Sequence, residues 1–276
     1  MKYLPLFFFL FATRSFAQTA HTPRMVSKTP FSIGESVQIH SEQLHEQRTL
    51  NIYLPAGYGE DTTKKYPVIY LLDGSADEDF IHIAGLVQFG TFPWVKLLPE
   101  SIVVGIANVD RKRDFTFPTH NAADKADLPT SGGSEAFIGF VEKELQPFIE
   151  SHYKTDSVRT LIGQSLGGLV ATEILFKKPD LFSHYILVSP SLWWDDESLL
   201  KWAPLPGSSL KTVYLTAGKE EHPVMVRTAR ELSEKLGQID SSHIRLIFNI
   251  MDGQDHGNIL HLAVYDAFGK MFGTVK

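Results

Sequence analysis

One serine stands in a glycine-framed turn at residues 163–168, which read GQSLGG. An apolar run at 160–162 precedes the turn and a helical run at 169–176 follows it. A G-x-S-x-G pattern between a strand and a helix is typical of a sharp turn that exposes a nucleophilic serine. The hydroxyl then lies at a helix N-terminus, where free N–H groups favour developing negative charge. Ser165 is therefore the predicted nucleophile.

A serine hydroxyl reacts poorly until a base removes its proton, so the sequence must also supply a histidine. In enzymes with this serine turn, an acid and then the histidine follow the nucleophile along the chain. Among the 11 histidines, His256 follows the apolar run at 244–250 and opens the final helical segment. His243 starts that run and His261 lies inside the helical segment, which suits surface or packing positions. His256 is therefore the predicted base.

The acid that orients the histidine is expected after the apolar run at 213–216. Glu220 and Glu221 both lie there, and adjacent side chains point in different directions, so only one faces the imidazole. Glu221, three residues after Gly218, is the favoured residue and Glu220 is the alternative. If both glutamates are solvated, Asp252 or Asp255 orients the ring instead.

An oxyanion that forms when a serine attacks a carbonyl group needs two N–H donors. Leu166, directly after the serine, supplies one in this turn geometry. The second is expected from the loop after the run at 68–72, which reads DGS. Gly74 lets the backbone approach a substrate there, and the Ser75 N–H is the predicted second donor. The alternative is a plain turn.

Two arginines and two tryptophans are candidates for substrate contacts. Arg111 and Arg113 would hold an anionic group, and Trp193 and Trp194 would stack on a flat acyl or aromatic group. The alternative for the arginines is pairing with neighbouring acids such as Asp110 and Asp114, and for the tryptophans a place in the core wall.

The elements that must position these residues alternate along the chain. Mostly apolar runs predict strands covered on both faces, at 68–72, 102–106, 160–162, 185–188, 213–216 and 244–250. Amphipathic segments predict helices at 137–149, 167–178, 224–236 and 258–272. Polar–apolar alternation at 36–40 and 49–54 predicts half-exposed antiparallel edge strands. The pattern predicts an α/β fold with a mostly parallel central sheet, antiparallel N-terminal strands and helices on both faces. The long stretch 108–133 is predicted to be a functional loop.

Composition excludes several classes of protein. The chain has 276 residues, of which 43% are hydrophobic and 21% charged, which is typical of a globular domain and not of a disordered chain. A net charge of −6 argues against binding to nucleic acid or to an anionic membrane. The absence of cysteine excludes disulfides, thiolate metal sites and a cysteine nucleophile. The histidines are scattered and no phosphate-binding loop is present, so no metal and no cofactor are expected.

The first residues are predicted to be a targeting segment. A positive start, an apolar run at 4–12 and a small residue at each of positions 15 and 17 are typical of a secretory signal cleaved after Ala17. A short membrane anchor is the alternative, but the apolar run is far below the roughly 20 residues that a bilayer needs. We therefore expect a single domain at 18–276, exported to the periplasm or secreted, with no stable membrane anchor.

Several stretches together resemble the putative-esterase family of α/β-hydrolases, which includes siderophore esterases, feruloyl esterases and mycolyltransferases. They read YLLDG at 70–74, NVDRKRDFT at 108–116, GQSLGG at 163–168 and SPSLWW at 189–194. The resemblance spans about Glu35 to the C-terminus, and the RKRD and SPSLWW stretches point to the siderophore-esterase branch. It implies an α/β-hydrolase fold, with the site residues placed as above.

The expected activity is hydrolysis of a small-molecule carboxylic ester, such as a siderophore or an aryl or acyl ester. The reaction would use a Ser-His-Glu triad and an acyl-serine intermediate. Acyl transfer to a sugar or lipid hydroxyl is an alternative because mycolyltransferases share these motifs, and non-catalytic ligand binding is a third possibility. The sequence predicts neither the natural ester nor the oligomeric state.

Overall fold

The computed structural model describes residues 22–273. Internal contacts divide the chain into two units, Met1–Ser32 and Ile33–Lys276. In the first unit, residues 22–32 are exposed and form neither helix nor strand. The predicted signal peptide, residues 1–17, lies outside the described residues. Every helix and strand described below belongs to the second unit.

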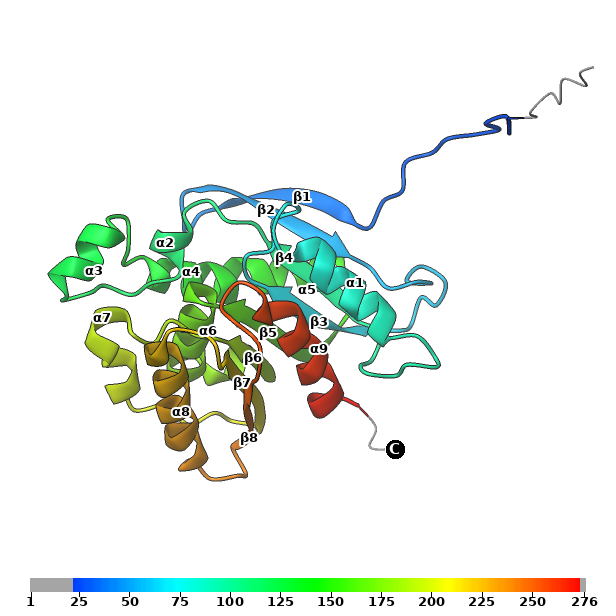
Figure 1. The fold of residues 1–276 in the computed structure, drawn as a ribbon. Coiled ribbons are helices and arrows are strands. Elements are labelled where there is room, and N and C mark those ends of the chain that lie inside the picture. Colours follow the sequence, from blue (N-terminus) through cyan, green and yellow to red (C-terminus); the bar gives the residue numbers. More distant parts are fainter. Residues whose placement is uncertain (1–21, 274–276) are drawn as a thin grey trace, which may run out of the picture. The chain divides into compact units, whose positions relative to one another are not determined.

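One mixed sheet runs through the second unit (Figure 1). Its strands are β1 (Glu35–Ser41), β2 (Glu46–Tyr53), β3 (Tyr66–Leu71), β4 (Ile102–Ile106), β5 (Thr155–Gln164), β6 (His184–Val188), β7 (Lys211–Gly218) and β8 (Ile244–Met251). Across the sheet their order is β1-β2-β4-β3-β5-β6-β7-β8. The pairs β1–β2 and β2–β4 are antiparallel, and the other neighbours are parallel. The predicted sheet, mostly parallel with antiparallel N-terminal strands, is confirmed.

The position of β2 corrects one expectation. The sequence predicts two half-exposed edge strands, and β1 is indeed an edge, but β2 lies between β1 and β4. Leu50 and Ile52 of β2 are fully buried, and polar Asn51 between them is only 5% exposed. Polar–apolar alternation reports the two faces of a strand, whereas its lateral neighbours are chosen by backbone hydrogen bonding, which every sequence can offer.

The helices connect the strands. They are α1 (Phe80–Gly90), α2 (Arg111–Asp114), α3 (Ala122–Asp127), α4 (Ser134–Phe140), α5 (Gln146–His152), α6 (Leu166–Lys177), α7 (Trp194–Glu197), α8 (Pro223–Gly237) and α9 (Ile259–Met271). A π-turn, η1 (Val141–Leu145), joins α4 to α5, and the 3-10 turns η2 (Pro179–Leu181) and η3 (Ser198–Lys201) follow α6 and α7. The predicted helices correspond to α4–α5, α6, α8 and α9. Within residues 22–273, no helix combines the length and apolar character that a membrane span requires.

Helix α1 was not predicted, and its sequence explains why. Its buried residues recur at helical spacing, as Phe80, Ile83 and Val87 show. Ile81 and Phe89 on its other side are also apolar yet about half exposed, so the polar face that marks an amphipathic helix is missing. Short helices α2 and α3 likewise lie inside the stretch 108–133 that was predicted as a loop.

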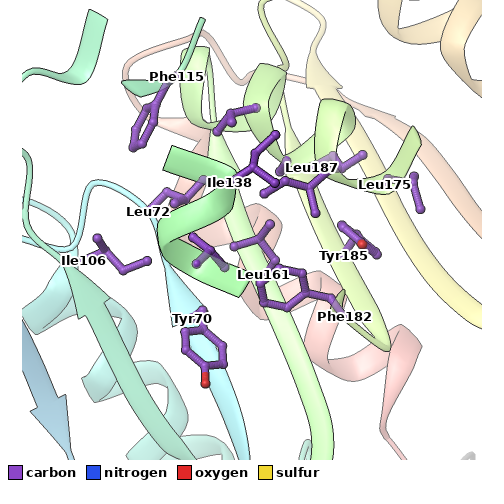
Figure 2. Close-up of a cluster of buried hydrophobic side chains, with 14 of the residues drawn as sticks. Tyr70, Leu72, Ile106, Phe115, Ile138, Leu161, Leu175, Phe182, Tyr185 and Leu187 are labelled. Carbon is purple, nitrogen blue, oxygen red and sulfur yellow. The ribbon is translucent and has the colours of Figure 1, made fainter. Parts of the chain in front are cut away.

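Helices cover both faces of the sheet. On one face, α4–α5, α6 and α8 pack with side chains such as Tyr70 and Leu72, and Figure 2 shows part of this core. On the other face, α1 and α9 lie side by side and pack with Ile69 and Leu71 (Figure 1). Successive residues of β3 thus face opposite cores, which is why the strand is apolar without interruption. The carboxyl ends of the parallel strands then lie on the same side of the sheet, and the candidate site is found there.

Candidate active site

The turn that carries Ser165 has the strained geometry expected of an exposed nucleophile. Ser165 lies between the end of β5 and the start of α6, with φ 59° and ψ −121°. A positive φ is costly for a residue other than glycine, and such strain persists only where surrounding contacts impose it. A Cβ at Gly163 would lie 2.4 Å from the Gly167 carbonyl oxygen, so the strand and helix approach too closely for any side chain there.

The Ser165 hydroxyl is hydrogen-bonded to another serine and not to a histidine. Its Oγ lies 3.2 Å from the Ser191 Oγ, and the Ser191 N–H donates to the Ser165 carbonyl over 3.0 Å. Within residues 22–273, no hydrogen bond joins Ser165 to His256. In this conformation the Ser165 side chain is therefore held by the segment that follows β6.

His256 and Glu221 form a direct pair. The His256 Nδ1 lies 2.8 Å from the Glu221 Oε2. The other carboxylate oxygen of Glu221 accepts the Ser189 hydroxyl and, over 2.7 Å, the Gly218 N–H. Burial favours a higher pKa for Glu221, but the hydrogen bonds from His256, Ser189 and Gly218 outweigh it and lower the pKa below its usual value. The carboxylate is thus held ionised against the imidazole ring.

The structure distinguishes the four acids that the sequence left as partners for His256. Glu221 is buried, whereas Glu220 is exposed. Asp252 forms an ion pair with Lys219, with 2.7 Å between Oδ1 and Nζ. The Asp255 carboxylate accepts N–H groups of its own turn, among them that of Gly257 at 2.8 Å. Only Glu221 of these acids contacts the ring in the described part of the chain.

A hydrogen bond from a side chain connects the serine turn to the histidine loop. The Gln164 Nε2 donates to the His256 carbonyl over 2.6 Å, and Gln164 directly precedes Ser165. The strands that precede the three residues are close in the sheet. Only β6 lies between β5 and β7, and β8 is the next strand after β7. The imidazole side chain is 45% exposed. Ser165, Glu221 and His256 therefore all lie at the carboxyl ends of parallel strands.

The loop after β3 is held tightly by its glycine. The Gly74 N–H donates to the Ile106 carbonyl over 3.0 Å, and its carbonyl accepts the Asn51 amide over 2.8 Å. A Cβ at Gly74 would lie 2.4 Å from the Gly105 Cα, so only glycine fits. No acceptor within residues 22–273 pairs with the Ser75 N–H. This leaves it free for a substrate oxygen, as the prediction for Ser75 requires.

Both arginines predicted to hold an anion are paired within the chain. Arg111 binds Asp73 through two bonds, Nε to Oδ1 at 2.6 Å and Nη2 to Oδ2 at 2.9 Å. Arg113 bonds to Asp114 and, through both terminal nitrogens, to Glu46. Each positive charge is therefore paired with carboxylates of the protein itself, as the alternative interpretation of the sequence allows, and a substrate contact of either arginine stays a prediction.

The two tryptophans have different environments. Trp194 is completely buried, and its indole N–H donates to the Phe117 carbonyl over 2.9 Å. This corrects the prediction of a substrate contact, because a side chain without exposed surface cannot stack on a ligand. Trp193 is only partly buried against the same core, and its substrate contact stays a prediction.

Sequence reasoning assigned no role to several residues that hold the site together. Ser189 and Ser191 contact Glu221 and Ser165, and Asp73 anchors Arg111. Ser189 and Ser191 directly follow β6, which pairs with the strand that leads to Ser165. Their position after this strand was the sequence signal for a role in the site. Among residues 22–273, no group of three or more histidine, aspartate or glutamate side chains is arranged to hold a metal ion.

Comparisons with known proteins identify the family and the fold. The family described as "Putative esterase" matches residues 41–258. Ferri-bacillibactin esterase BesA of Bacillus subtilis (strain 168) is 34% identical over 253 residues, covering 84% of this chain and 87% of the relative. The structure of an IroE-like serine hydrolase from Shewanella oneidensis has 28% identity and a TM-score of 0.78, covering 88% of this chain and 82% of that one. The BES protein from Bacillus cereus has 27% identity and a TM-score of 0.76, covering 92% of this chain and all (100%) of that one.

The matched segment contains the whole site. Residues 41–258 include the loop after β3, the serine turn, Glu221 and His256. The solved relatives share the sheet and its helical layers over most of both chains. The chain therefore belongs to the putative esterase family and is an ester hydrolase with the α/β-hydrolase fold.

Proposed function

We propose that the chain hydrolyses a small-molecule carboxylic ester through a Ser165–His256–Glu221 triad and an acyl-serine intermediate. The observation that carries the proposal is the buried Glu221 carboxylate, 2.8 Å from the His256 Nδ1, beside a serine in a strained strand-to-helix turn. An ionised acid on Nδ1 fixes the tautomer whose Nε2 accepts a proton, and it stabilises the imidazolium that forms.

The first half-reaction acylates the serine. The Ser165 Oγ attacks the ester carbonyl carbon while its proton passes to the His256 Nε2, and Glu221 stabilises the resulting cation. The Ser75 and Leu166 N–H groups bind the oxyanion. The carbon–oxygen bond to the alcohol then breaks, and His256 returns the proton to the departing oxygen. Fixed donors of this kind typically contribute about 100- to 1,000-fold each to the rate.

The second half-reaction frees the enzyme. A water molecule gives a proton to His256 and attacks the acyl carbon, and collapse of the oxyanion breaks the bond to the Ser165 Oγ. His256 protonates that oxygen, and the carboxylic acid leaves. The Ser165 hydroxyl is bonded to Ser191, so it must exchange that partner for His256 before it can give up its proton.

The names of two relatives support a proposal for the substrate class. BesA is named for the ester of ferri-bacillibactin, and a second relative, 27% identical, is a siderophore triacetylfusarinine C esterase of Aspergillus fumigatus. We therefore place siderophore esters first among the substrates. The predicted signal at residues 1–17 would locate the reaction outside the cytoplasm, in the periplasm or the medium.

Replacement of the nucleophile tests the proposal. Ser165→Ala should lower kcat for p-nitrophenyl acetate by at least about 10⁴-fold, because loss of the serine in enzymes of this mechanism costs about 10⁶-fold. It should also abolish covalent labelling by diethyl p-nitrophenyl phosphate, while the thermal unfolding midpoint stays near the wild-type value. Turnover that survives in the folded variant would refute the mechanism.

A substrate panel tests the specificity. Ferric and iron-free trilactone siderophores, methyl ferulate and short p-nitrophenyl esters are compared by kcat/KM. Preference for a siderophore ester is the expected result, and preference for methyl ferulate would overturn it. Product analysis in the presence of added alcohol separates hydrolysis from acyl transfer, since only a transferase forms mainly the new ester.

A further inference from the structure

Asp73 lies at the start of the oxyanion loop, defined as Asp73-Gly74-Ser75, and is held in an unusual conformation. Its φ is 55°, in the left-handed region, and the residue is only 8% exposed. Its Oδ1 accepts the Asn108 amide at 2.7 Å and the Arg111 Nε at 2.6 Å. A buried carboxylate with positive φ requires such partners, because neither its charge nor its backbone is otherwise favourable.

Arg111 joins this loop to the serine turn. Its Nη2 donates to the Asp73 Oδ2 at 2.9 Å and to the Gln164 carbonyl at 3.3 Å. That carbonyl belongs to the peptide bond that links Gln164 to Ser165. One guanidinium group therefore contacts both the loop that carries the Ser75 N–H and the peptide that carries the nucleophile.

The guanidinium is confined in this position. Its carbon lies 5.6 Å from the centroid of the Phe115 ring, and Phe115 is fully buried. The two bonds to Asp73 fix the plane of the group, since a paired arginine–carboxylate contact is directional as well as strong. Turning Arg111 toward a substrate would break both bonds and leave Asp73 without its positive partner.

We propose that Arg111 is a positioning residue that acts through Asp73, setting the distance between the Ser75 N–H and the Ser165 oxygen. The inference rests on the proposed function. Oxyanion stabilisation depends on donors placed within a few tenths of an ångström. A small displacement of the oxyanion loop therefore reduces stabilisation of the transition state more than binding of the substrate. Loss of Arg111 therefore lowers kcat and leaves KM nearly constant.

Arg113 offers an internal comparison in the same short helix. The two side chains are equally exposed, at 31% and 32%, and both are paired with carboxylates. Arg113, however, bonds to Glu46 on β2 and to Asp114, which touch neither the oxyanion loop nor the serine turn. Its removal is expected to cost stability, whereas removal of Arg111 is expected to cost catalysis.

The experiment measures kcat, KM and the unfolding midpoint of full-length variants with p-nitrophenyl acetate, a small neutral ester. Arg111→Gln should lower kcat about 30- to 100-fold with KM within about twofold, since a misplacement of about 1 Å typically costs about 100-fold. Arg111→Lys keeps the charge but not the paired geometry, so about a tenfold loss is expected. Asp73→Asn should lose a similar factor, and the double variant Arg111→Gln/Asp73→Asn should lose no more than either single one.

Matched controls define the outcome. Lys112→Gln removes an exposed charge from the same helix and should leave kcat unchanged. Arg113→Gln should lower the unfolding midpoint at least as much as Arg111→Gln but reduce kcat by less than about threefold. The rate at which diethyl p-nitrophenyl phosphate labels Ser165 should fall in parallel with kcat, because that reaction uses the same oxyanion donors.

Three results would overturn the inference. Unchanged kcat in folded Arg111→Gln or Asp73→Asn excludes positioning. A raised KM for mono-4-nitrophenyl succinate, with normal kcat for the neutral acetate, shows instead that Arg111 binds an anionic substrate. A lower unfolding midpoint with normal kcat shows a purely structural role. If Arg111→Gln does not fold, Arg111→Lys and Asp73→Asn decide the question. Activity that survives Ser165→Ala refutes the proposed function itself, and is thereby distinguished from failure of this inference.

Discussion

The acid–base half of the site and its nucleophile half meet at Gln164 but differ in how far they are assembled. In the acid–base half, at the ends of β7 and β8, Glu221 and His256 already share the hydrogen bond that the proposed mechanism uses. In the nucleophile half, at the ends of β3, β5 and β6, the Ser165 hydroxyl is bonded to Ser191. The difference indicates that the orientation of the imidazole is built into the fold, whereas the proposed mechanism requires Ser165 to exchange Ser191 for His256.

The two halves also differ in the direction in which they shift the pKa of a carboxyl group. Glu221 keeps a lowered pKa because hydrogen bonds outweigh its burial. Asp79, just before α1, has its pKa raised to about 6, first by burial and then by the charges of Asp73 and Glu78. One carboxylate is thus stabilised in its charged form, whereas the charged form of the other is destabilised by burial and by the charges of Asp73 and Glu78. Three substitutions test this comparison, beyond those already given for Ser165 and Arg111.

Breaking the acid–base half should have the largest effect of the three. Glu221→Gln should lower kcat/KM for p-nitrophenyl acetate by about 10⁴-fold, as loss of the orienting charge does in enzymes with a serine–histidine–acid triad. An amide in that position no longer stabilises the imidazolium, and it donates where the ring needs an acceptor. Steady-state kinetics measure the loss, and circular dichroism verifies the fold.

The neighbouring glutamate is the matched control for that substitution. Glu220 is exposed and its side chain makes no hydrogen bond in the described chain, so Glu220→Gln should retain activity within about twofold. Equal losses in the two variants, or a loss only in Glu220→Gln, would contradict the assignment of Glu221.

Freeing the nucleophile should have a smaller effect in the opposite direction. Ser191→Ala removes the hydroxyl that holds Ser165, so a larger fraction of the serine side chains can turn to His256. One neutral hydrogen bond is worth about 0.5–1.5 kcal/mol, so labelling by diethyl p-nitrophenyl phosphate should accelerate by about two- to tenfold. A slower reaction in a folded variant would show that Ser191 assists attack and would remove the contrast between the halves.

The Asp79 carboxylate provides the smallest effect, on stability. A raised pKa means that the folded state favours the protonated acid, so the wild type loses stability as pH rises from about 4 to about 6, with no further loss above. Asp79→Asn abolishes this loss. Its unfolding midpoint should exceed that of the wild type by about 2 °C at pH 8, a modest shift because the group is partly solvated, and should match it near pH 4.

Thermal unfolding at several pH values checks this expectation, with Asp77→Asn as an exposed control on the same loop. A midpoint difference that is constant across pH would show that ionisation of Asp79 is not its cause. A variant less stable than the wild type at pH 8 would show that Asp79 supports the loop through contacts that depend on its charge.

Much of the fold was predictable because strands that are covered on both faces consist of continuous apolar runs. Each predicted strand is present, and the serine turn lies between β5 and α6 as its glycines indicated. Helix α1 escaped detection because Ile81 and Phe89 are apolar on its exposed side. The place of β2 inside the sheet was also not predictable, since backbone pairing carries no side-chain signature.

In the site, the sequence alone determined which residue types follow each strand: a serine after β5, two glutamates after β7 and a histidine after β8. Local spacing is enough to identify these candidates, because the order of strands and turns along the chain restricts the positions at which a nucleophile and its base can occur. Only the tertiary structure decided that Glu221, and not Glu220, contacts the ring, and that Arg111 and Arg113 bind different carboxylates. Each of those choices depends on which side chain is buried against residues distant in sequence, and hydrogen bonds across such distances exist only after the sheet has assembled.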